Sequence, residues 1–400
     1  MVAWAPPSGQ GFPQLTTTGK APAAAPNGPG SAACPTNAPV RSYDVSIFNG
    51  ITFDQGQPGE SDAAPETGGS WAVMYALSRD EADIKAGHKP VVPLVIRANA
   101  GECLRVTLHN DLPTDHFTWT WGSGSTRAGF NIGNVIYDPQ QSYGAAIGYD
   151  PDTTVAPGSS RLYSYYVDKE LGTNLVLNMG NESSWRSGAY GALIAEPTGS
   201  TWSNPVTGDT LDGQSGLAAD IHLPNGSAFR EFTTIFSDRE PLLGHDIMEY
   251  YLDSDHSYLD YNEESLTQRE GDNLTDIPLW QAKSDSVAAG ADPATPTFEA
   301  KAGDPVRWRF ADATGDDPVS FQIAGHSFPL DHGLTGSQII EARTLLPGET
   351  FDAYLVHGAG GATQATGDYE YNVGRDPIIK SGDWGIFRVV PQTNTSIKSL

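Results

Sequence analysis

Three segments of the chain occur twice, in the same order along the sequence. Residues 99–110, NAGECLRVTLHN, resemble residues 301–312, KAGDPVRWRFAD, and both place Ala-Gly before a run that alternates apolar and polar residues. Residues 155–167 and 345–356 share a Pro-Gly turn that opens a strand. Residues 188–197 and 382–391 share the pattern Gly-x-x-Gly before an apolar run. The separations are 202, 190 and 194 residues, which predicts two homologous antiparallel β-sandwiches of the Greek-key type.

The repeat divides the 400-residue chain into two predicted domains. We expect the first sandwich at residues 41–200 and the second at 228–392, with a polar connection at 201–227 between them. Residues 1–40 are rich in Pro, Ala and Gly and predict an irregular arm, and residues 393–400 predict a short tail. The 44 glycines and 29 prolines, with only 18% charged residues, are typical of a loop-rich, all-β protein.

The chain is strongly acidic, with a formal net charge of −26. This charge repels nucleic-acid phosphates and acidic lipid head groups, so we expect no nucleic-acid partner. We also expect no membrane association, because no apolar run is long enough to span a bilayer.

Two cysteines, Cys34 and Cys103, are too few to form a zinc site alone. They could form one disulfide that ties the N-terminal arm to the first domain, or remain two buried thiols. A disulfide would indicate an oxidising compartment. The expected location is therefore extracellular or periplasmic.

Residues 244–271 are rich in carboxylates and contain His245 and His256. A calcium-binding EF-hand loop requires a defined ligand spacing with glycine at its sixth position, and this segment lacks that glycine. We therefore predict a solvated acidic loop, with a divalent-cation site as the alternative.

Several longer stretches resemble the multicopper oxidase family, in particular the cupredoxin domains of its two-domain laccase-like and bacterial manganese-oxidase-like members. The similarity lies in segments spread over most of residues 40–390, namely 93–113, 137–158, 165–173, 188–202, 292–310, 358–361 and 382–389. This resemblance implies two cupredoxin-like Greek-key sandwiches. In the family, four His-x-His pairs hold a trinuclear copper cluster, and a nearby Cys and His, often with an axial Met, hold a further copper.

The resemblance also implies where those copper ligands would lie in this chain. Other residues stand at the corresponding positions: Asn131 and Gly133, Asn178 and Gly180, Val319, Gln322 and Ala324, and Asn372, Val373 and Gly374, with Asp383 near the place of the axial Met. Imidazole and thiolate are the donors that copper requires, and none remains at these positions. We therefore expect no copper cofactor and no copper-dependent oxidase activity.

Three of the four pairs have become Asn-x-Gly and the fourth Gln-x-Ala, a repetition that suggests a use for the vacated volume. Glycine in place of histidine would open space, and facing amides could line a polar pocket because each both donates and accepts hydrogen bonds. The alternative is a structural seam in which the amides satisfy one another without a ligand.

Other titratable residues offer acid–base alternatives in the second domain. His326 or His332 could pair with Asp331 for proton transfer, although a histidine without such a role is the more frequent case. Asp383 is a further catalytic candidate by its position.

Three functions fit these observations. The first is a copper-free protein with a binding or structural role, in which the vacated positions could receive a small organic molecule. The second is a metal-independent enzyme that promotes a cyclisation or addition in the same pocket by positioning its substrate. The third is an oxidase with an atypical metal site. The two-domain relatives close a ring of three subunits head to tail, which implies a homotrimer here.

Overall fold

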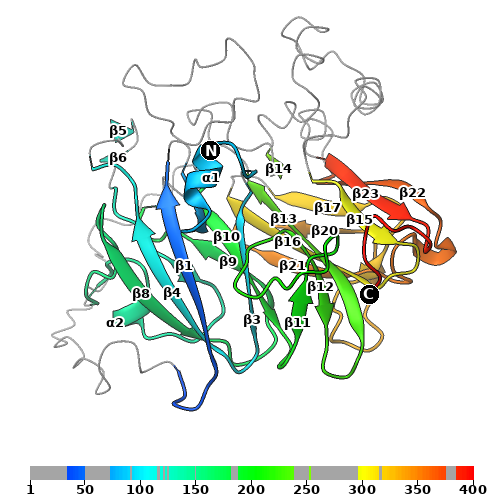
Figure 1. Cartoon of the computed structure of the whole chain (residues 1–400), viewed down its shortest axis with the longest axis horizontal. Coiled ribbons are helices and arrows are strands. Elements are labelled where there is room, and N and C mark those ends of the chain that lie inside the picture. The colour runs from blue at the N-terminus through cyan, green and yellow to red at the C-terminus, as the bar shows by residue number, and fades with distance from the viewer. Residues whose placement is uncertain are drawn as a thin grey trace, which may run out of the picture.

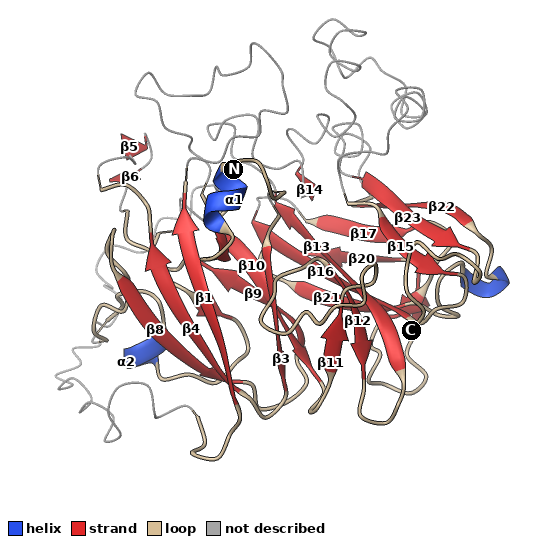
Figure 2. Ribbon diagram, viewed as in Figure 1, coloured by secondary structure: helices blue, strands red, loops and turns tan. Residues whose placement is uncertain are grey.

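The computed structural model describes residues 34–49, 73–90, 92–114, 118–119, 122–123, 126–148, 150–181, 188–237, 252–253, 296–314, 318–374 and 384–400. Strands dominate this part of the chain, as Figure 2 shows, and the predicted all-β class is confirmed. Asp383 and the first 33 residues of the predicted arm lie outside the described residues. So does the acidic segment 244–271, apart from the backbone of β14 (Leu252–Asp253).

The first sandwich consists of two four-stranded sheets. The outer sheet has the order β2 (Met74–Leu77), β1 (Val40–Phe48), β4 (Cys103–Asn110) and β8 (Ser160–Tyr166). The inner sheet has the order β3 (Leu94–Asn99), β10 (Tyr190–Glu196), β9 (Gly172–Leu177) and β7 (Asn131–Ile132). Their alternate residues, such as Val106 of β4 and Ile96 of β3, form one buried core between the sheets.

The second sandwich repeats this plan with two larger sheets. Its inner sheet has the order β11 (Thr201–Ser203), β12 (Ala218–His222), β13 (Ala228–Ser237), β16 (Val306–Thr314) and β21 (Thr350–Tyr354), and β14 pairs with β13. Its outer sheet has the order β15 (Phe298–Lys301), β23 (Trp384–Val390), β22 (Gly367–Asn372), β17 (Val319–Ile323) and β20 (Ala342–Leu345). Aromatic side chains such as Trp308 and Phe387 fill the core between them.

The remaining elements are short. Two hairpin-like pairs join β5 (Thr118–Trp119) to β6 (Gly122–Ser123) and β18 (Phe328–Pro329) to β19 (Ile339–Ile340). Helices α1 (Glu81–Lys85) and α2 (Pro139–Ser142) and a 3-10 turn at Gly361–Thr363 complete the described elements. The side chain of Asp138 caps α2 by accepting the backbone N–H of Gln140, and Pro139 stands at the first helical position.

The turns of the two domains confirm the internal repeat. Gly101 and Gly303 both adopt positive φ, +89° and +85°, in the turn that precedes β4 and β16. The carboxylates of Glu102 and Asp304 each accept the backbone N–H three residues earlier, at 2.8 Å and 3.0 Å. The same turn chemistry therefore opens the corresponding strand in both domains.

The two inner sheets pack against each other, so the molecule has four layers of strands (Figure 1). A third apolar cluster lies between them, with Val95 and Ile194 from the first domain and Ile235 and Ala311 from the second. Alternation explains how one strand serves two layers: in β16, Phe310 points into the domain core, whereas Ala311 faces the other domain. The interface between the domains is thus a buried layer.

Two further features bear on the sequence predictions. Cys34 and Cys103 form a disulfide with an S–S distance of 2.02 Å, which confirms one of the two alternatives for these residues. The predicted polar connection at 201–227 contains β11 and β12, which pair in antiparallel fashion and extend the inner sheet of the second domain through β13.

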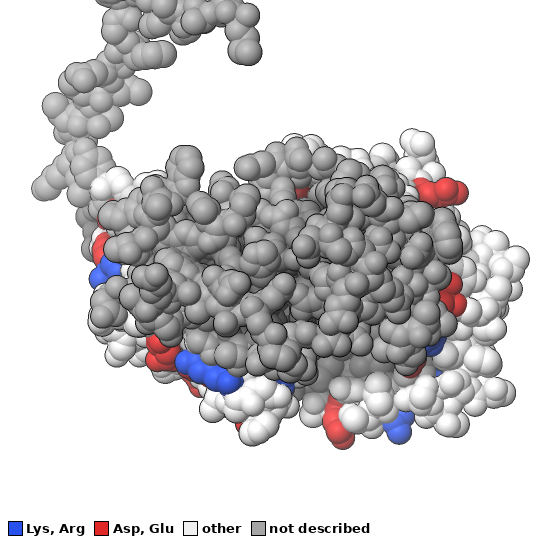
Figure 3. All heavy atoms as spheres, turned by 90° about the horizontal axis from the view of Figure 1, so that it is seen from above, with Lys and Arg blue, Asp and Glu red and all other residues white. Residues whose placement is uncertain are grey.

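The described part of the surface carries charges of both signs. In the view from above, separate acidic and basic side chains are visible among the other described residues (Figure 3). No helix within the described ranges is long and apolar enough to cross a membrane.

Candidate functional site

Asn178 follows strand β9 and is completely buried. Its side-chain oxygen accepts the backbone N–H groups of Gly129 at 2.6 Å and Gly180 at 3.0 Å. The second bond closes a local turn across Asn-x-Gly, a conformation that an Asn side chain favours. Asn178 therefore joins the end of β9 to the segment that leads into β7.

Asn372, the last residue of β22, forms the corresponding turn in the second domain. Its side-chain oxygen accepts the backbone N–H of Gly374 at 2.8 Å, and also the side-chain amide of Gln322 at the same distance. Gln322 lies directly opposite Asn372 in the ladder between β17 and β22. The Asn372 amide nitrogen in turn donates to the carboxylate of Glu370.

The glycines of these two turns are in close contact with neighbouring backbone. A Cβ atom at Gly180 would lie 2.9 Å from the backbone nitrogen of Gly129. Gly374 has a φ of +72°, and a Cβ atom there would lie 2.7 Å from the carbonyl oxygen of Ser320. The space expected from the loss of imidazole is therefore filled at both positions. Gly133 differs, since a Cβ atom there would lie 3.9 Å from its nearest neighbour, the carbonyl oxygen of Leu175.

The other two predicted pocket residues take no part in the side-chain hydrogen bonds of these turns. Asn131 is opposite Leu177 in the β7–β9 ladder, not opposite Asn178, and donates to the carbonyl oxygen of Tyr143 at 3.0 Å. Ala324 is exposed after β17, and its N–H donates to the carbonyl of Glu370. Within one chain, the sheet that contains β16 lies between the Asn178 turn and the Asn372 turn. The predicted set thus forms two separate sites, one in each domain.

The donor atoms at these positions do not fit copper. The two asparagine side-chain oxygens already accept hydrogen bonds, and Cys34 and Cys103 are joined to each other. Within the described ranges, no three His, Cys, Asp or Glu side chains converge as a metal site would require. Copper prefers imidazole nitrogen and thiolate sulfur, so the present donor set offers it little affinity.

His326 has both ring nitrogens engaged and is 3% exposed. Its Nδ1 lies 2.8 Å from the carbonyl oxygen of Ala324, and its Nε2 accepts the backbone N–H of Gly360 at 3.0 Å. Burial lowers the pKa of His326, and the bond to Ala324 opposes that change only in part. This geometry is that of a neutral histidine that fixes two loops, since both nitrogens are bound to backbone.

Asp331 and His332 are exposed, and both line an open cleft. The carboxylate of Asp331 accepts the backbone N–H of Gly333 at 2.9 Å, and the ring of His332 stacks on Tyr354 with centroids 3.9 Å apart. In the described part of the chain, no ion pair joins Asp331 to His332 or to His326. The predicted acid–base pairing is therefore not formed in this conformation.

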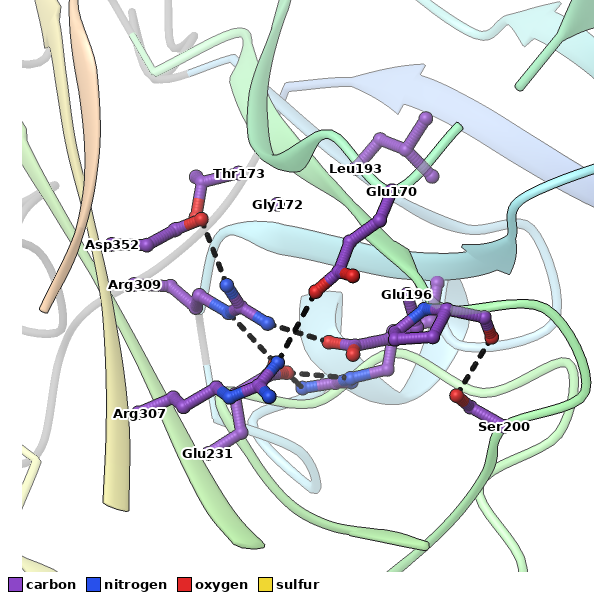
Figure 4. Close-up of polar contacts among 12 residues, drawn as sticks. Glu170, Gly172, Thr173, Leu193, Glu196, Ser200, Glu231, Arg307, Arg309 and Asp352 are labelled. Carbon is purple, nitrogen blue, oxygen red and sulfur yellow. Dashed lines mark hydrogen bonds and ion pairs between the residues drawn. The ribbon is translucent and has the colours of Figure 1, made fainter. Parts of the chain in front are cut away.

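A buried cluster of charges lies between the two inner sheets, beside the third apolar cluster. Figure 4 shows the guanidinium of Arg309 among three carboxylates: Asp352 at 2.8 Å, Glu196 at 2.7 Å and Glu231 at 2.9 Å. Glu231 also binds Arg97 of the first domain at 2.8 Å. Four of these side chains are at most 1% exposed, so the cluster joins the domains away from solvent.

The pKa values of two carboxylates in this cluster, Glu196 and Glu231, are shifted in opposite directions. Burial raises the pKa of Glu196 to about 8, although the charge of Arg309 opposes the rise. Burial would also raise the pKa of Glu231, but the charges of Arg97 and Arg309 outweigh it and lower the value to about 2. Within one buried cluster, the pKa of Glu196 is therefore raised and that of Glu231 is lowered.

Comparisons with known proteins give a fold and a distant relative. No protein-family model matches the chain. The probable nitrite reductase-hydroxylamine oxidoreductase fusion protein of Kuenenia stuttgartiensis is 24% identical over 308 residues, 76% of this chain. The chain spans 28% of that relative's length.

Solved structures resemble the chain over nearly its whole length. A crystal structure of a multicopper oxidase covers 90% of this chain and 92% of its own, with a TM-score of 0.50 and 14% identity. A copper nitrite reductase from Nitrosomonas europaea covers 89% of this chain and 97% of its own, with a TM-score of 0.46 and 13% identity. The expected resemblance to multicopper oxidases is thus confirmed for the fold.

Proposed function

We propose that this chain is a non-redox protein with a multicopper-oxidase fold, and that it has a binding or structural role without copper. The observation that carries the proposal is the bonding of Asn178 and Asn372. Each side chain accepts the backbone N–H of the glycine two residues later, in corresponding turns of the two domains. Positions that hold metal ligands in the resembling family are here used for turns.

Coordination chemistry supports the same proposal. A neutral amide oxygen is a weak ligand for copper, and displacing the buried bonds of Asn178 would leave the N–H groups of Gly129 and Gly180 without an acceptor. A buried donor left unpaired costs about 1–3 kcal/mol. Copper at this position would therefore disrupt bonds that the folded chain needs.

Copper analysis of the purified chain tests this proposal. The untagged protein is incubated with Cu(II), and separately with Cu(I), then dialysed and analysed by atomic absorption and electron paramagnetic resonance. We expect copper well below one atom per chain and no signal typical of a blue-copper site. One tightly bound copper per chain, with turnover of a phenolic electron donor, would contradict the proposal.

We also propose that the protein forms a homotrimer in an oxidising compartment, extracellular or periplasmic. Two sandwiches in series can close a ring head to tail, which brings the first domain of one subunit against the second domain of the next. The disulfide between Cys34 and Cys103 supports the compartment. Analytical ultracentrifugation should give a mass three times that of the chain, and a monomer at micromolar concentration would reject the ring.

A second candidate is a metal-independent enzyme of the same non-redox kind. The observation that favours it is the position of Asp331 and His332, the predicted acid–base residues, which both line an open cleft. Conversion of a bound small molecule, followed by nuclear magnetic resonance and lost in His332→Asn with binding retained, would favour the enzyme over a binding role.

A further inference from the structure

An open cleft of about 680 Å³ lies where the two domains meet. From the first domain it is lined by Leu171 and Thr173 at the start of β9. From the second domain it is lined by the turn between β18 and β19, by Arg343 of β20, and by residues 350–352 of β21. Clefts of about 300–1,000 Å³ at domain junctions are the usual size and place for small-molecule sites.

One side of this cleft is apolar. Leu330 and Leu334, on the turn between β18 and β19, are 40% and 62% exposed. Phe351 is half-buried and packs against Phe328 with ring centroids 5.4 Å apart, which fixes its orientation. These side chains offer a surface for a ring or a short aliphatic body, because covering them removes apolar area from water.

Arg343 supplies a cation beside this apolar surface. Its guanidinium carbon lies 5.3 Å from the centroid of the Phe351 ring. Its Nε–H group is buried without a hydrogen-bond partner, and within the described residues the outer guanidinium nitrogens have no hydrogen bond or ion pair either. A guanidinium without an acceptor at the edge of a cleft can bind an acceptor from a ligand through its outer N–H groups.

The carboxylates of the cleft have partners within the protein. Asp352 binds Arg309 at 2.8 Å through one oxygen and the hydroxyl of Thr173 at 2.5 Å through the other. Asp331 accepts the N–H of Gly333. Arg343 is therefore the lining cation whose N–H is still available, and a carboxylate matches the planar geometry of a guanidinium.

We infer that the cleft binds a small organic acid, with its carboxylate at Arg343 and its apolar or aromatic body against Leu330, Leu334 and Phe351. This inference deepens the proposed binding role and rests on it. It places the ligand away from the Asn178 and Asn372 turns, at a position that neither the repeat nor the resemblance indicates.

Isothermal titration calorimetry of the full chain with benzoate tests the inference, and benzamide serves as the uncharged ligand of similar shape. We expect saturable binding of one benzoate per chain and about tenfold weaker binding of benzamide, since a charge-assisted bond is lost. Arg343→Gln should weaken benzoate binding about tenfold and bring it level with benzamide.

Arg388→Gln is the matched control, because Arg388 is an arginine of the same domain that pairs with Asp368 at 2.8 Å and does not line the cleft. This variant should bind benzoate like the unchanged protein. Circular dichroism and thermal melts of both variants establish that they fold. Equal benzoate binding by Arg343→Gln, or no saturable binding by the unchanged protein up to millimolar benzoate, would overturn the inference. The copper analysis described above is a separate measurement. A cleft that does not bind benzoate would leave the non-redox proposal intact, and a bound copper would contradict that proposal without bearing on Arg343.

Discussion

The two copies of the repeat place the same strand in different surroundings. Strand β4 belongs to the outer sheet of the first domain, and the face that points away from its core carries the exposed Arg105 and the half-buried Thr107. Strand β16 belongs to the inner sheet of the second domain, and the corresponding face carries Arg307 and the buried Arg309. In Figure 1, β4 lies near the edge of the molecule and β16 at its centre.

This comparison shows that a repeated strand keeps its core-facing residues and changes the other face. Val106 and Trp308 occupy corresponding core positions, whereas Thr107 corresponds to Arg309. A charge can be buried in β16 because the other domain and neighbouring strands supply Glu196 and Glu231 as partners. Without partners, burial of the guanidinium would be strongly unfavourable.

The first prediction compares the removal of an arginine from the buried face of β16 with the removal of one from the exposed face of β4, and it has the largest effect on stability. Arg309→Met should lower the free energy of unfolding by about 3–5 kcal/mol, because the buried Glu196 and Glu231 and the partly buried Asp352 lose their shared cation. The matched variant Arg105→Met, on the exposed face of β4, should change it by less than about 0.5 kcal/mol. Urea denaturation of both variants measures the contrast, and equal losses would mean that the charge cluster does not stabilise the domain interface.

The second prediction compares how much stability each asparagine turn contributes. Asn178→Leu should cost about 3 kcal/mol, since the buried N–H of Gly129 and the N–H of Gly180 lose their acceptor. Asn372→Leu should cost less, about 1–2 kcal/mol, because Gln322 and Gly374 are nearer to solvent. Thermal unfolding followed by circular dichroism provides the values. A ligand-binding role for these amides would instead appear as unchanged stability in both variants.

A smaller effect tests whether the glycine positions are filled. Gly180→Ala should destabilise the protein by about 1–3 kcal/mol, because the added methyl group meets the backbone of Ala128 and Gly129. Gly133→Ala is the control, as its Cβ would have ordinary room, and it should change stability by less than about 0.5 kcal/mol. If Gly180→Ala is as stable as the control, space does remain at the vacated position.

The last prediction concerns how the stability of the protein changes with pH. The pKa of Glu196 is raised in the folded chain, to about 8, so the folded state keeps a proton that the unfolded state releases near its ordinary pKa. Stability from this group is therefore full below that ordinary pKa and decreases as the pH rises toward 8. Glu196→Gln should flatten this decrease between pH 5 and 8 in urea titrations. A slope identical to that of the unchanged protein would exclude Glu196 as its source.

The sequence predicted the fold well because the repeat depends on local signals. Ala-Gly turns, Pro-Gly turns and alternating strands each depend on residues that are close in the sequence. Gly101 and Gly303 have the positive φ angles that the predicted Ala-Gly turns require. The disulfide partners were limited to two cysteines, so one pairing was available.

The site was harder to predict because its contacts join distant residues. The internal repeat and the family resemblance indicated Asn178 and Asn372. They could not show that the side-chain oxygens bind nearby backbone or that neighbouring backbone fills the space at Gly180. The sequence does carry a signal for the charge cluster, because Arg97 interrupts one apolar run and Glu196 ends another. A charge within such a strand predicts a buried partner, but only the packing of the domains identifies it.

Crystals soaked in a cupric salt, with anomalous differences measured at the copper absorption edge, will show whether the asparagine turns can hold a metal. If the asparagine turns are structural, no anomalous peak will lie within bonding distance of Asn178 or Asn372, and both side chains will keep their bonds to Gly180 and Gly374. An ordered copper peak at either turn, with the amide oxygen rotated toward the metal, would mean that these turns are metal sites and that the protein is not copper-free.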